Sequence, residues 1–304
     1  MSNLKELRTR IEAIQSTQKI TSAMKMVAAS RLRRVQILVD KNQEYAENLR
    51  KSALRVLTEI EQEEKEKNIK YTRPLLLQKR KKAQKYELYV FSSDRGLCGA
   101  YNTNIAKKSI ERLNDLRQQN KQIKVYCSGK KAYDVLKRTY SDIEIILIDS
   151  IEGNVSYSEA SEKMAKHILK RFSNKDFDVC EIIYSDFLTT ISRNFVCEQV
   201  CPMELKLYNE NTADINQVGN AYYEYLPDKN TILEQITPIL FVDKIFQILV
   251  NSVAAEHSAR MTSMDNATRN AKKIINELKI KYNSLRQAAI TNELIEIISG
   301  ADAV

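Results

Sequence analysis

Glu256, His257 and Ser258 bring together an acid, a base and a nucleophile, the three side-chain types of a hydrolytic relay. They are consecutive in a stretch that we predict to be helical, where neighbouring side chains point in different directions. A relay requires the nucleophile and the base to lie within hydrogen-bond reach. These three residues alone therefore predict no catalytic site, and we expect His257 to lie on the surface or in a seam between helices.

Two glycines in the string SSDRGLCG (residues 92–99) are the next candidates. Gly96 and Gly99 directly follow a predicted strand, which is where phosphate-binding loops occur. The string lacks the glycine spacing of a dinucleotide fingerprint and the Gly-Lys-Ser/Thr ending of a P-loop. We interpret it as a tight strand-to-helix turn, in which Asp94 and Arg95 pair with each other or contact a partner.

The cysteines and histidines do not follow a metal-binding or disulfide pattern. Neither His167 nor His257 is near a cysteine in the sequence, and zinc sites use clustered ligands of these types. Cys197 and Cys201 lie in a predicted strand that would separate them by about 13 Å, beyond disulfide reach. We expect five reduced structural thiols, with no metal and no cofactor.

Prolines and glycines outline the elements that position these residues. The first Pro is Pro74, the first Gly is Gly96, and neither type occurs between Pro238 and Gly300. A helix over residues 239–299 would be roughly 90 Å long. A helix of that length needs a partner, so we predict that the two terminal segments form helices that pair antiparallel.

Apolar residues recur at steps of three and four in both terminal segments, which places them on one face of each helix. The predicted N-terminal stripe comprises Leu4, Leu7, Ile11, Ile14, Ile20, Met24, Val27, Leu32, Val35 and Val39. The predicted C-terminal stripe comprises Met261, Met264, Ala271, Ile275, Leu278, Tyr282 and Leu285. Long seams of this kind favour a coiled coil over globular packing.

Capping residues suggest where the terminal helices begin. Asn3 with Glu6 resembles a capping box, and the charge-dense stretch after Glu61 suggests a linker. Thr237 can cap the last helix, with Pro238 at its first position.

Between the terminal helices, predicted strands alternate with predicted helices. The strands are Tyr86–Phe91, Ile123–Cys127, Ile143–Asp149, Val179–Tyr184 and Asn194–Glu204, and the helices are Asn102–Gln119, Lys130–Tyr140 and Ser156–Phe172. Such alternation indicates an α/β fold with βαβ crossovers and a mainly parallel sheet, here ending in an antiparallel hairpin. We predict a Rossmann-like βαβ middle domain combined with a long antiparallel coiled coil. The segments are an N-terminal helix (1–61), a linker (62–85), the middle domain (86–230) and a C-terminal helix (231–304).

The net charge of +9 is concentrated in the N-terminal segment, where residues 1–55 hold 12 basic and 5 acidic side chains. A basic rod favours an acidic partner, such as nucleic acid, an acidic membrane face or an acidic protein surface, although a solvated helix face has the same composition. The uncharged run Ile245–Ala255 is too short to span a bilayer. The charged N-terminus does not fit a signal peptide.

Charge and fold class leave two alternatives open. The first is a basic coiled-coil adaptor that binds nucleic acid or another acidic polymer, although the chain lacks the aromatic arrays of single-strand binders. The second is a nucleotide-binding enzyme, which rests on the middle domain alone, and a fold does not imply a function.

Three regions resemble one protein family. The string TQKITSAMKMVAAS (17–30), the string SSDRGLCG (92–99), and SARMTSMDNATRNA (258–271) with RQAAITNELIEIISGA (286–301) are similar to signatures of the γ subunit of F-type ATP synthases. They occur in the family's order from one end of the chain to the other. The resemblance therefore covers the whole sequence.

The resemblance implies a rotating central shaft inside a hexamer of catalytic β and non-catalytic α subunits. The middle domain would be its foot, beside the ε subunit and the c ring, with δ elsewhere in the complex. Proton flow would turn the shaft, while ATP chemistry would stay on the partners. We expect no nucleic acid, and membrane association only through the complex. The expected place is the cytoplasmic face of the bacterial inner membrane, with the matrix side of the mitochondrial inner membrane as the alternative.

The resemblance also assigns contact residues. Met24 matches the position that passes an acidic lever of a catalytic subunit, Lys25 would meet that acid, and Arg260 and Met264 match positions on the opposing helix. The expected catch region near the tip comprises Arg286, Gln287, Thr291 and Glu293.

At the foot, the resemblance implies contacts from Tyr223, Tyr225 and Leu226. Leu226 stands where many relatives have an acidic residue, which puts the polar contact to the c ring in doubt. The cysteine insert of chloroplast members is missing, so we expect no thiol switch.

Overall fold

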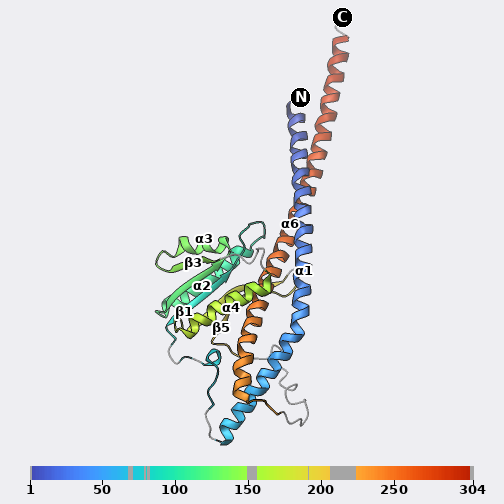
Figure 1. The fold of residues 1–304 in the computed structure, drawn as a ribbon. Coiled ribbons are helices and arrows are strands. Elements are labelled where there is room, and N and C mark those ends of the chain that lie inside the picture. Colours follow the sequence, from blue (N-terminus) through green and yellow to red (C-terminus); the bar gives the residue numbers. More distant parts are fainter. Residues whose placement is uncertain are drawn as a thin grey trace.

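Two long helices form a rod, and a sheet domain is attached to its lower half (Figure 1). The computed structural model describes residues 2–67, 71–78, 80, 83–148, 156–190, 192–205 and 224–301. Helix α1 (Ser2–Lys67) and helix α6 (Lys229–Ala301) run antiparallel, so that both termini lie at the same end. Helix α6 extends beyond α1 at that end (Figure 1).

The seam of α1 follows alternating steps of four and three residues over most of its length. Its positions are buried or half-buried and comprise Leu7, Ile11, Ile14, Gln18, Thr21, Lys25, Ala28, Leu32, Val35, Val39, Asn42, Ala46, Leu49, Ala53, Val56 and Ile60. This spacing is the heptad pattern of a coiled coil. The α1–α6 pairing is therefore continuous from the tip of α1 to its lower end.

The predicted stripe of α1 is wrong at two residues. Ile20 and Val27 are 57% and 53% exposed, while the seam passes through the neighbouring Thr21 and Ala28. Counting in heptad steps from Leu7 reaches the polar Thr21. The prediction selected the apolar neighbour Ile20 instead, which moved the predicted seam by one residue.

The C-terminal end of α1 and the N-terminal end of α6 lie at other residues than predicted. Helix α1 continues past Glu61 to Lys67, because Arg73 pairs with Glu61 and Glu64 and neutralises part of the acidic stretch. A charge-dense sequence is therefore helix where we expected a linker.

Helix α6 begins earlier than predicted, at Lys229. Asp228 caps it by accepting hydrogen bonds from the backbone N–H and the hydroxyl of Thr231. Pro238 lies inside the helix, and the Thr237 hydroxyl donates to the Leu233 carbonyl one turn back. The prediction that Thr237 caps the helix is therefore wrong. Asp228, nine residues earlier, is the residue that caps it.

The middle of the chain forms a five-stranded sheet with strand order β3-β2-β1-β4-β5. The elements are the 3-10 turn η1 (Leu75–Leu77), β1 (Lys85–Phe91), α2 (Tyr101–Gln118), β2 (Gln122–Ser128), α3 (Lys130–Thr139), β3 (Glu144–Ile148), α4 (Tyr157–Ser173), β4 (Val179–Phe187) and β5 (Arg193–Cys201). The first four strands pair in parallel, and β5 pairs antiparallel with β4. The predicted α/β fold is confirmed.

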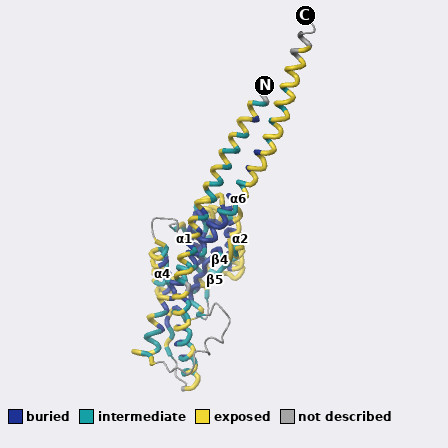
Figure 2. Tube along the Cα trace, turned by 90° about the vertical axis from the view of Figure 1, so that its right-hand side faces the viewer, coloured by how far each residue is buried: buried dark blue, intermediate teal, exposed yellow. Residues whose placement is uncertain are grey.

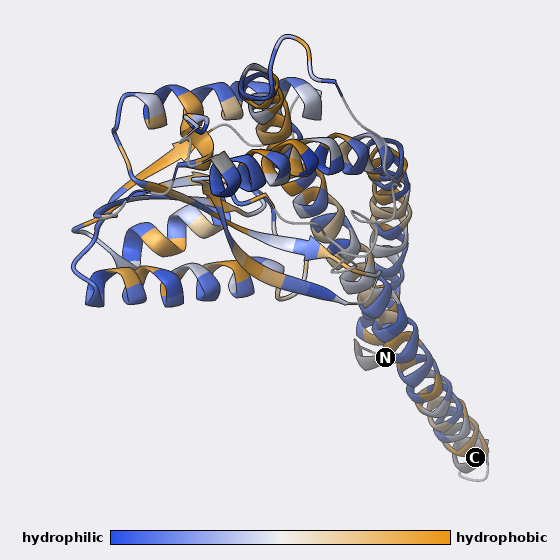
Figure 3. Cartoon of the chain, turned by 90° about the horizontal axis from the view of Figure 1, so that it is seen from below, coloured by the Kyte–Doolittle hydropathy of each residue, from blue (hydrophilic) through white to orange (hydrophobic). Residues whose placement is uncertain are grey.

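The sheet buries both of its faces. Alternate residues of β1 point to opposite sides, with Tyr89 and Phe91 packed under α4, and Leu88 and Val90 packed under α2 and α3. Figure 3 shows strongly apolar strand segments between helices whose surfaces alternate apolar and polar. Helix α6 supplies side chains to both cores, which joins the sheet domain to the rod.

The apolar character of α6 has an explanation in this packing. Among the described residues, α6 is the one helix with a segment long and apolar enough to cross a membrane, but 56% of that window is buried inside the protein. We therefore attribute its composition to its place in the core.

Candidate coupling surface of the helix pair

Above the sheet domain the two helices continue as a two-stranded rod (Figures 1 and 2). We call residues 2–27 of α1 and 264–301 of α6 the free helix pair. It begins at a collar where loops of the sheet domain meet Ser258, Thr262 and Ser263 of α6. The Ser258 hydroxyl donates to the Thr190 carbonyl over 2.7 Å, and a side chain on Gly99 would lie 3.9 Å from Cβ of Ser263.

The SSDRGLCG loop is a turn that packs against the sheet. Asp94 Oδ1 accepts a hydrogen bond from the backbone N–H of Lys130 over 3.0 Å, at the start of α3. Gly129 has a φ of 104°, and a Cβ there would lie 2.2 Å from the Ser92 carbonyl oxygen. These contacts support the interpretation of a strand-to-helix turn, and they give Asp94 a backbone partner.

Two of the three consecutive residues with catalytic side-chain types, Glu256 and Ser258, have partners outside this triplet. Glu256 Oε1 lies 2.6 Å from Arg260 Nη2, and Ser258 bonds Thr190. His257 is buried, and its burial, together with Arg260 and Arg31, lowers its pKa to about 4. Of the two predicted locations for His257, its burial excludes the surface and supports the seam, because the ring lies inside the rod near Arg31 of α1. The imidazole is neutral at pH 7.

Lys25 contacts the opposing helix of its own chain. Its Nζ lies 2.6 Å from Asp265 Oδ1 on α6, and this bond holds the pKa of Asp265 below its usual range. Met24 beside it is half-buried. One turn away, the Thr21 and Thr268 hydroxyls lie 2.8 Å apart.

Arg260 and Met264 are buried in the rod. They therefore support the shape of the helix pair from within. On the surface of α1 near this level, Ile20, Met26 and Val27 are exposed, and Ile20 and Val27 lie seven residues apart on one face. The predicted stripe placed Ile20 and Val27 in the seam, whereas the heptad phase that starts at Leu7 leaves both exposed.

The four predicted tip residues are all exposed on α6, which places them on the surface of the free helix pair. The Thr291 hydroxyl donates to the Gln287 carbonyl one turn back, which leaves its oxygen able to accept a hydrogen bond from outside. Large apolar side chains are exposed among them. These are Ile290, Leu294, Ile295 and Ile298. The tip therefore offers polar and apolar groups on one helix.

At the other end of the rod, two of the predicted foot residues have different surroundings. The Tyr225 hydroxyl donates to Glu59 Oε1 over 2.8 Å, and burial and this bond raise the pKa of Tyr225 to about 12. Lys229 Nζ lies 2.9 Å from Glu59 Oε2, so the same glutamate also forms an ion pair with the first residue of α6. Leu226 is 78% exposed. Tyr223 lies outside the described residues.

Thiols and metal-ligand types do not form a site in the part of the chain that the structure describes. It contains no group of three or more His, Cys, Asp or Glu side chains placed to hold a metal ion. All five cysteines are free. Burial raises the pKa of Cys127 and of Cys197 to about 12, which disfavours the reactive thiolate.

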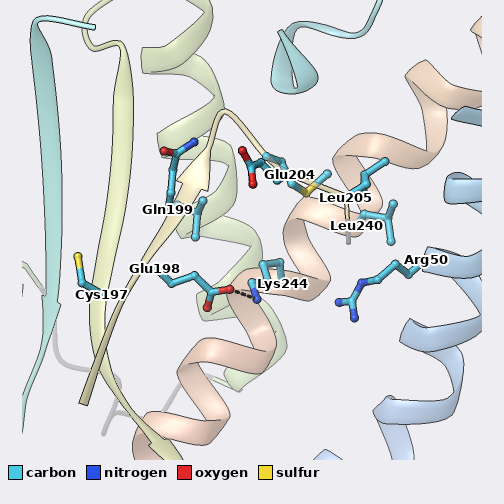
Figure 4. A pocket seen from close by; sticks show the side chains of 10 residues that line it. Arg50, Cys197, Glu198, Gln199, Glu204, Leu205, Leu240 and Lys244 are labelled. Carbon is cyan, nitrogen blue, oxygen red and sulfur yellow. Dashed lines mark ion pairs between the residues drawn. The ribbon is translucent and has the colours of Figure 1, made fainter. Parts of the chain in front are cut away.

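A cavity of about 440 Å³ lies between β5, α6 and α1 (Figure 4). Figure 4 shows Lys244 of α6 paired with Glu198 of β5, with Arg50 projecting from α1 nearby. Acidic and basic groups both line the cavity. Its electrostatics therefore favour neither an anion nor a cation.

Comparison with known proteins identifies the family. The ATP synthase family model matches residues 3–304. The chain is 38% identical to the ATP synthase gamma chain of Pelagibacter ubique over 305 residues, and 39% identical to that of Maricaulis maris over 307, with 100% of each chain covered.

Solved structures have the same fold. The rotor of the Euglena gracilis mitochondrial ATP synthase matches with a TM-score of 0.61 at 17% identity, covering 95% of this chain and 99% of that one. The central stalk of the Tetrahymena thermophila enzyme matches with a TM-score of 0.56 at 21% identity, covering 82% and 99%. The chain, with its two paired helices and inserted sheet domain, belongs to the ATP synthase gamma chain family.

Proposed function

We propose that this protein is the central rotor shaft of an F-type ATP synthase. It couples proton-driven rotation of the c ring to ATP synthesis or hydrolysis on the catalytic β subunits, and it has no catalytic site of its own. The observation that carries this proposal is the free helix pair, a two-helix rod that rises beyond the sheet domain. The family supplies the context in which such a rod has a mechanical role.

The surface of the free helix pair supports an enclosing partner. Ile20, Met26 and Val27 are exposed on α1, and Ile290 and Leu294 on α6. Soluble monomers rarely expose large contiguous apolar patches unless something binds there. The basic excess of residues 1–55 additionally suits acidic surfaces on the surrounding α and β subunits.

We assign coupling contacts to Met24 and to the tip residues. Arg286, Gln287, Thr291 and Glu293 are exposed and can make charge-assisted hydrogen bonds with subunit loops, which are strong individually. Arg260 and Met264 are buried in the isolated chain. Their contribution is to hold the shape of the shaft at the collar.

We assign the foot of the shaft to the sheet domain and the shaft to α1 (Ser2–Lys67) and α6 (Lys229–Ala301), which moves the predicted boundaries at residues 61 and 231 to the observed helix ends. The exposed Leu226 supports an apolar contact to the c ring, beside the ε subunit, with δ elsewhere in the complex. Membrane association is through the complex alone. The proposed location is the cytoplasmic face of the bacterial inner membrane.

Affinity purification in a mild detergent tests the function. A tagged chain should retain the α, β and ε subunits and the c ring. An eluate without catalytic subunits would overturn the proposal. Nucleic acid in the eluate with a steep loss of binding at raised salt would instead support the adaptor alternative.

A further inference from the structure

A polar layer interrupts the seam of the free helix pair. Lys25 Nζ lies 2.6 Å from Asp265 Oδ1, and the Thr21 hydroxyl lies 2.8 Å from the Thr268 hydroxyl. Apolar seam positions flank this layer on both sides. They are Leu7, Ile11 and Ile14 toward the tip, beyond the polar seam residue Gln18, and Ala28, Leu32 and Val35 toward the sheet domain.

The layer lies at the first turn above the collar. Ser258 and Thr262 hold α6 to the Thr190 carbonyl, and Ser263 faces the Gly99 loop. Above the collar, α6 rises beside α1 as the free helix pair (Figure 1). An interaction here sets how the two helices enter the unsupported part of the rod.

We propose that Thr21, Lys25, Asp265 and Thr268 form a register lock for the shaft. They determine which residues of α1 face which residues of α6, and thereby which side chains the shaft presents around its circumference. They are positioning residues, and Lys25 acts on α6 of its own chain. The structural part of this inference stands on the seam alone, while its consequence for coupling rests on the proposed function.

Apolar seams alone do not select a register strongly, because one apolar layer can replace another. A polar residue at a seam position specifies register in coiled coils. A slip of α6 by one heptad would bring Lys25 opposite Lys272 or opposite Ser258. The first is a like charge, and the second already donates to Thr190.

The same slip would separate the two hydroxyls. Thr21 would then face Met261 or Ile275 in place of Thr268. A slip by one heptad in either direction would therefore lose both the Lys25–Asp265 ion pair and the contact between the Thr21 and Thr268 hydroxyls. The lowered pKa of Asp265 fits this arrangement, because the bond from Lys25 favours its charged form.

Exchanging the two charges tests the proposal in the assembled complex. Lys25→Asp and Asp265→Lys each place like charges in the seam, whereas the double variant restores an opposite pair. We expect each single variant to lower proton pumping per ATP hydrolysed by at least about twofold, the lower end of coupling energies for residues in contact. The double variant should recover most of the loss. If Lys25 served an acidic partner subunit instead, exchanging the charges would not restore pumping.

Cross-linking in the isolated full-length chain reads the register directly. Thr21→Cys combined with Thr268→Cys should form a disulfide on mild oxidation when residues 25 and 265 carry opposite charges, as in the wild type and in the Lys25→Asp/Asp265→Lys double variant. The disulfide yield should be much lower when only one of these two charges is reversed. Met26→Cys combined with Thr268→Cys is the matched control, because Met26 is exposed on the outer face of α1.

Two results would overturn the register lock. One is equal Thr21→Cys/Thr268→Cys cross-linking in all four charge backgrounds. The other is a charge-exchanged chain that pumps no better than the worse single variant. The cross-linking result does not depend on assembly, so it separates failure of this inference from failure of the proposed function.

Discussion

Helix α6 has two parts with different environments, one inside the sheet domain and one in the free helix pair. Residues 252–260 are buried without interruption, whereas from Thr268 to Ala289 only every third or fourth residue is buried or half-buried. A helix that is buried all round belongs to a core, and one with a single apolar stripe belongs to a helix pair. The lower part thus resists change on every face, and the upper part leaves most of its surface available to partners.

Charged groups follow the same division. In the lower part, the Glu256–Arg260 pair is almost fully buried. In the upper part, Arg269 pairs with Asp265 in an exposed position. A buried charge that loses its partner is costly, while an exposed pair contributes little. Equal substitutions should therefore have unequal effects in the two parts.

The largest contrast should come from the two ion pairs. Arg260→Met leaves the buried Glu256 carboxylate without the guanidinium that lies 2.6 Å away, and we expect a loss of about 3–5 kcal/mol in the free energy of unfolding. Arg269→Met, the matched control in the upper part, should cost less than about 1 kcal/mol. Urea denaturation of the isolated chain, followed by circular dichroism, measures both. Similar costs for the two variants would contradict the division.

Two isoleucines test the same comparison for apolar groups. Ile245 is fully buried and Ile280 is exposed. Ile245→Ala should cost about 2–5 kcal/mol through lost burial and the cavity left behind. Ile280→Ala should change stability by less than about 0.5 kcal/mol, as expected for a surface substitution. The same denaturation experiment applies, and a large loss for Ile280→Ala would indicate that this position is packed in the isolated chain.

His257 should give the lower part a pH dependence. Its pKa is lowered from 6.5 to about 4 by burial, Arg260 and Arg31. The unfolded chain therefore takes up a proton below pH 6.5 that the folded chain does not, and stability falls as the pH drops from 6.5 to 4. We expect this residue to account for about 3 kcal/mol over that window.

Replacing the two histidines isolates that contribution. Unfolding measured at several pH values should have a shallower slope in His257→Gln. The exposed His167 provides the matched control, and the slope of His257→Gln is compared with that of His167→Gln. A wild-type slope in His257→Gln would show that the ring is not kept neutral by the fold.

The smallest effect is expected at the tip. Residues 292–295 and Ile298 are exposed, so removing residues 292–304 should change the free energy of unfolding by less than about 0.5 kcal/mol. Thermal unfolding of the shortened chain measures this. Global unfolding on truncation would mean that the tip contributes to the core and does not serve as a partner surface.

The sheet domain was predictable because its signals are local. Short apolar runs rich in aromatic and β-branched residues alternate with helical segments between residues 85 and 201, and this alternation predicts parallel strand pairing through crossovers. The start of α6 was not predictable in this way. Thr237 and Pro238 are a plausible cap in sequence, but Asp228 and the Lys229–Glu59 pair extend the helix upstream.

The candidate site was only partly predictable. The motifs named residues on both long helices, and the tip residues among them are exposed, which a contact region requires. The motifs did not indicate that Arg260, Met264 and Tyr225 face inward, nor that Lys25 has a partner in its own chain. A seam phase followed strictly from Leu7 would have placed Lys25 correctly.

By itself, the sequence determined that two long helices flank an α/β sheet domain, because helix breakers and residue periodicity act on the local backbone. Only the tertiary structure decided the partner of each charged residue. Lys25 and Asp265 are 240 residues apart, and they meet because α1 and α6 pack along one seam. The rotation of each helix about its own axis depends on that packing, and it separates the residues that hold the rod together from those that it presents to partners.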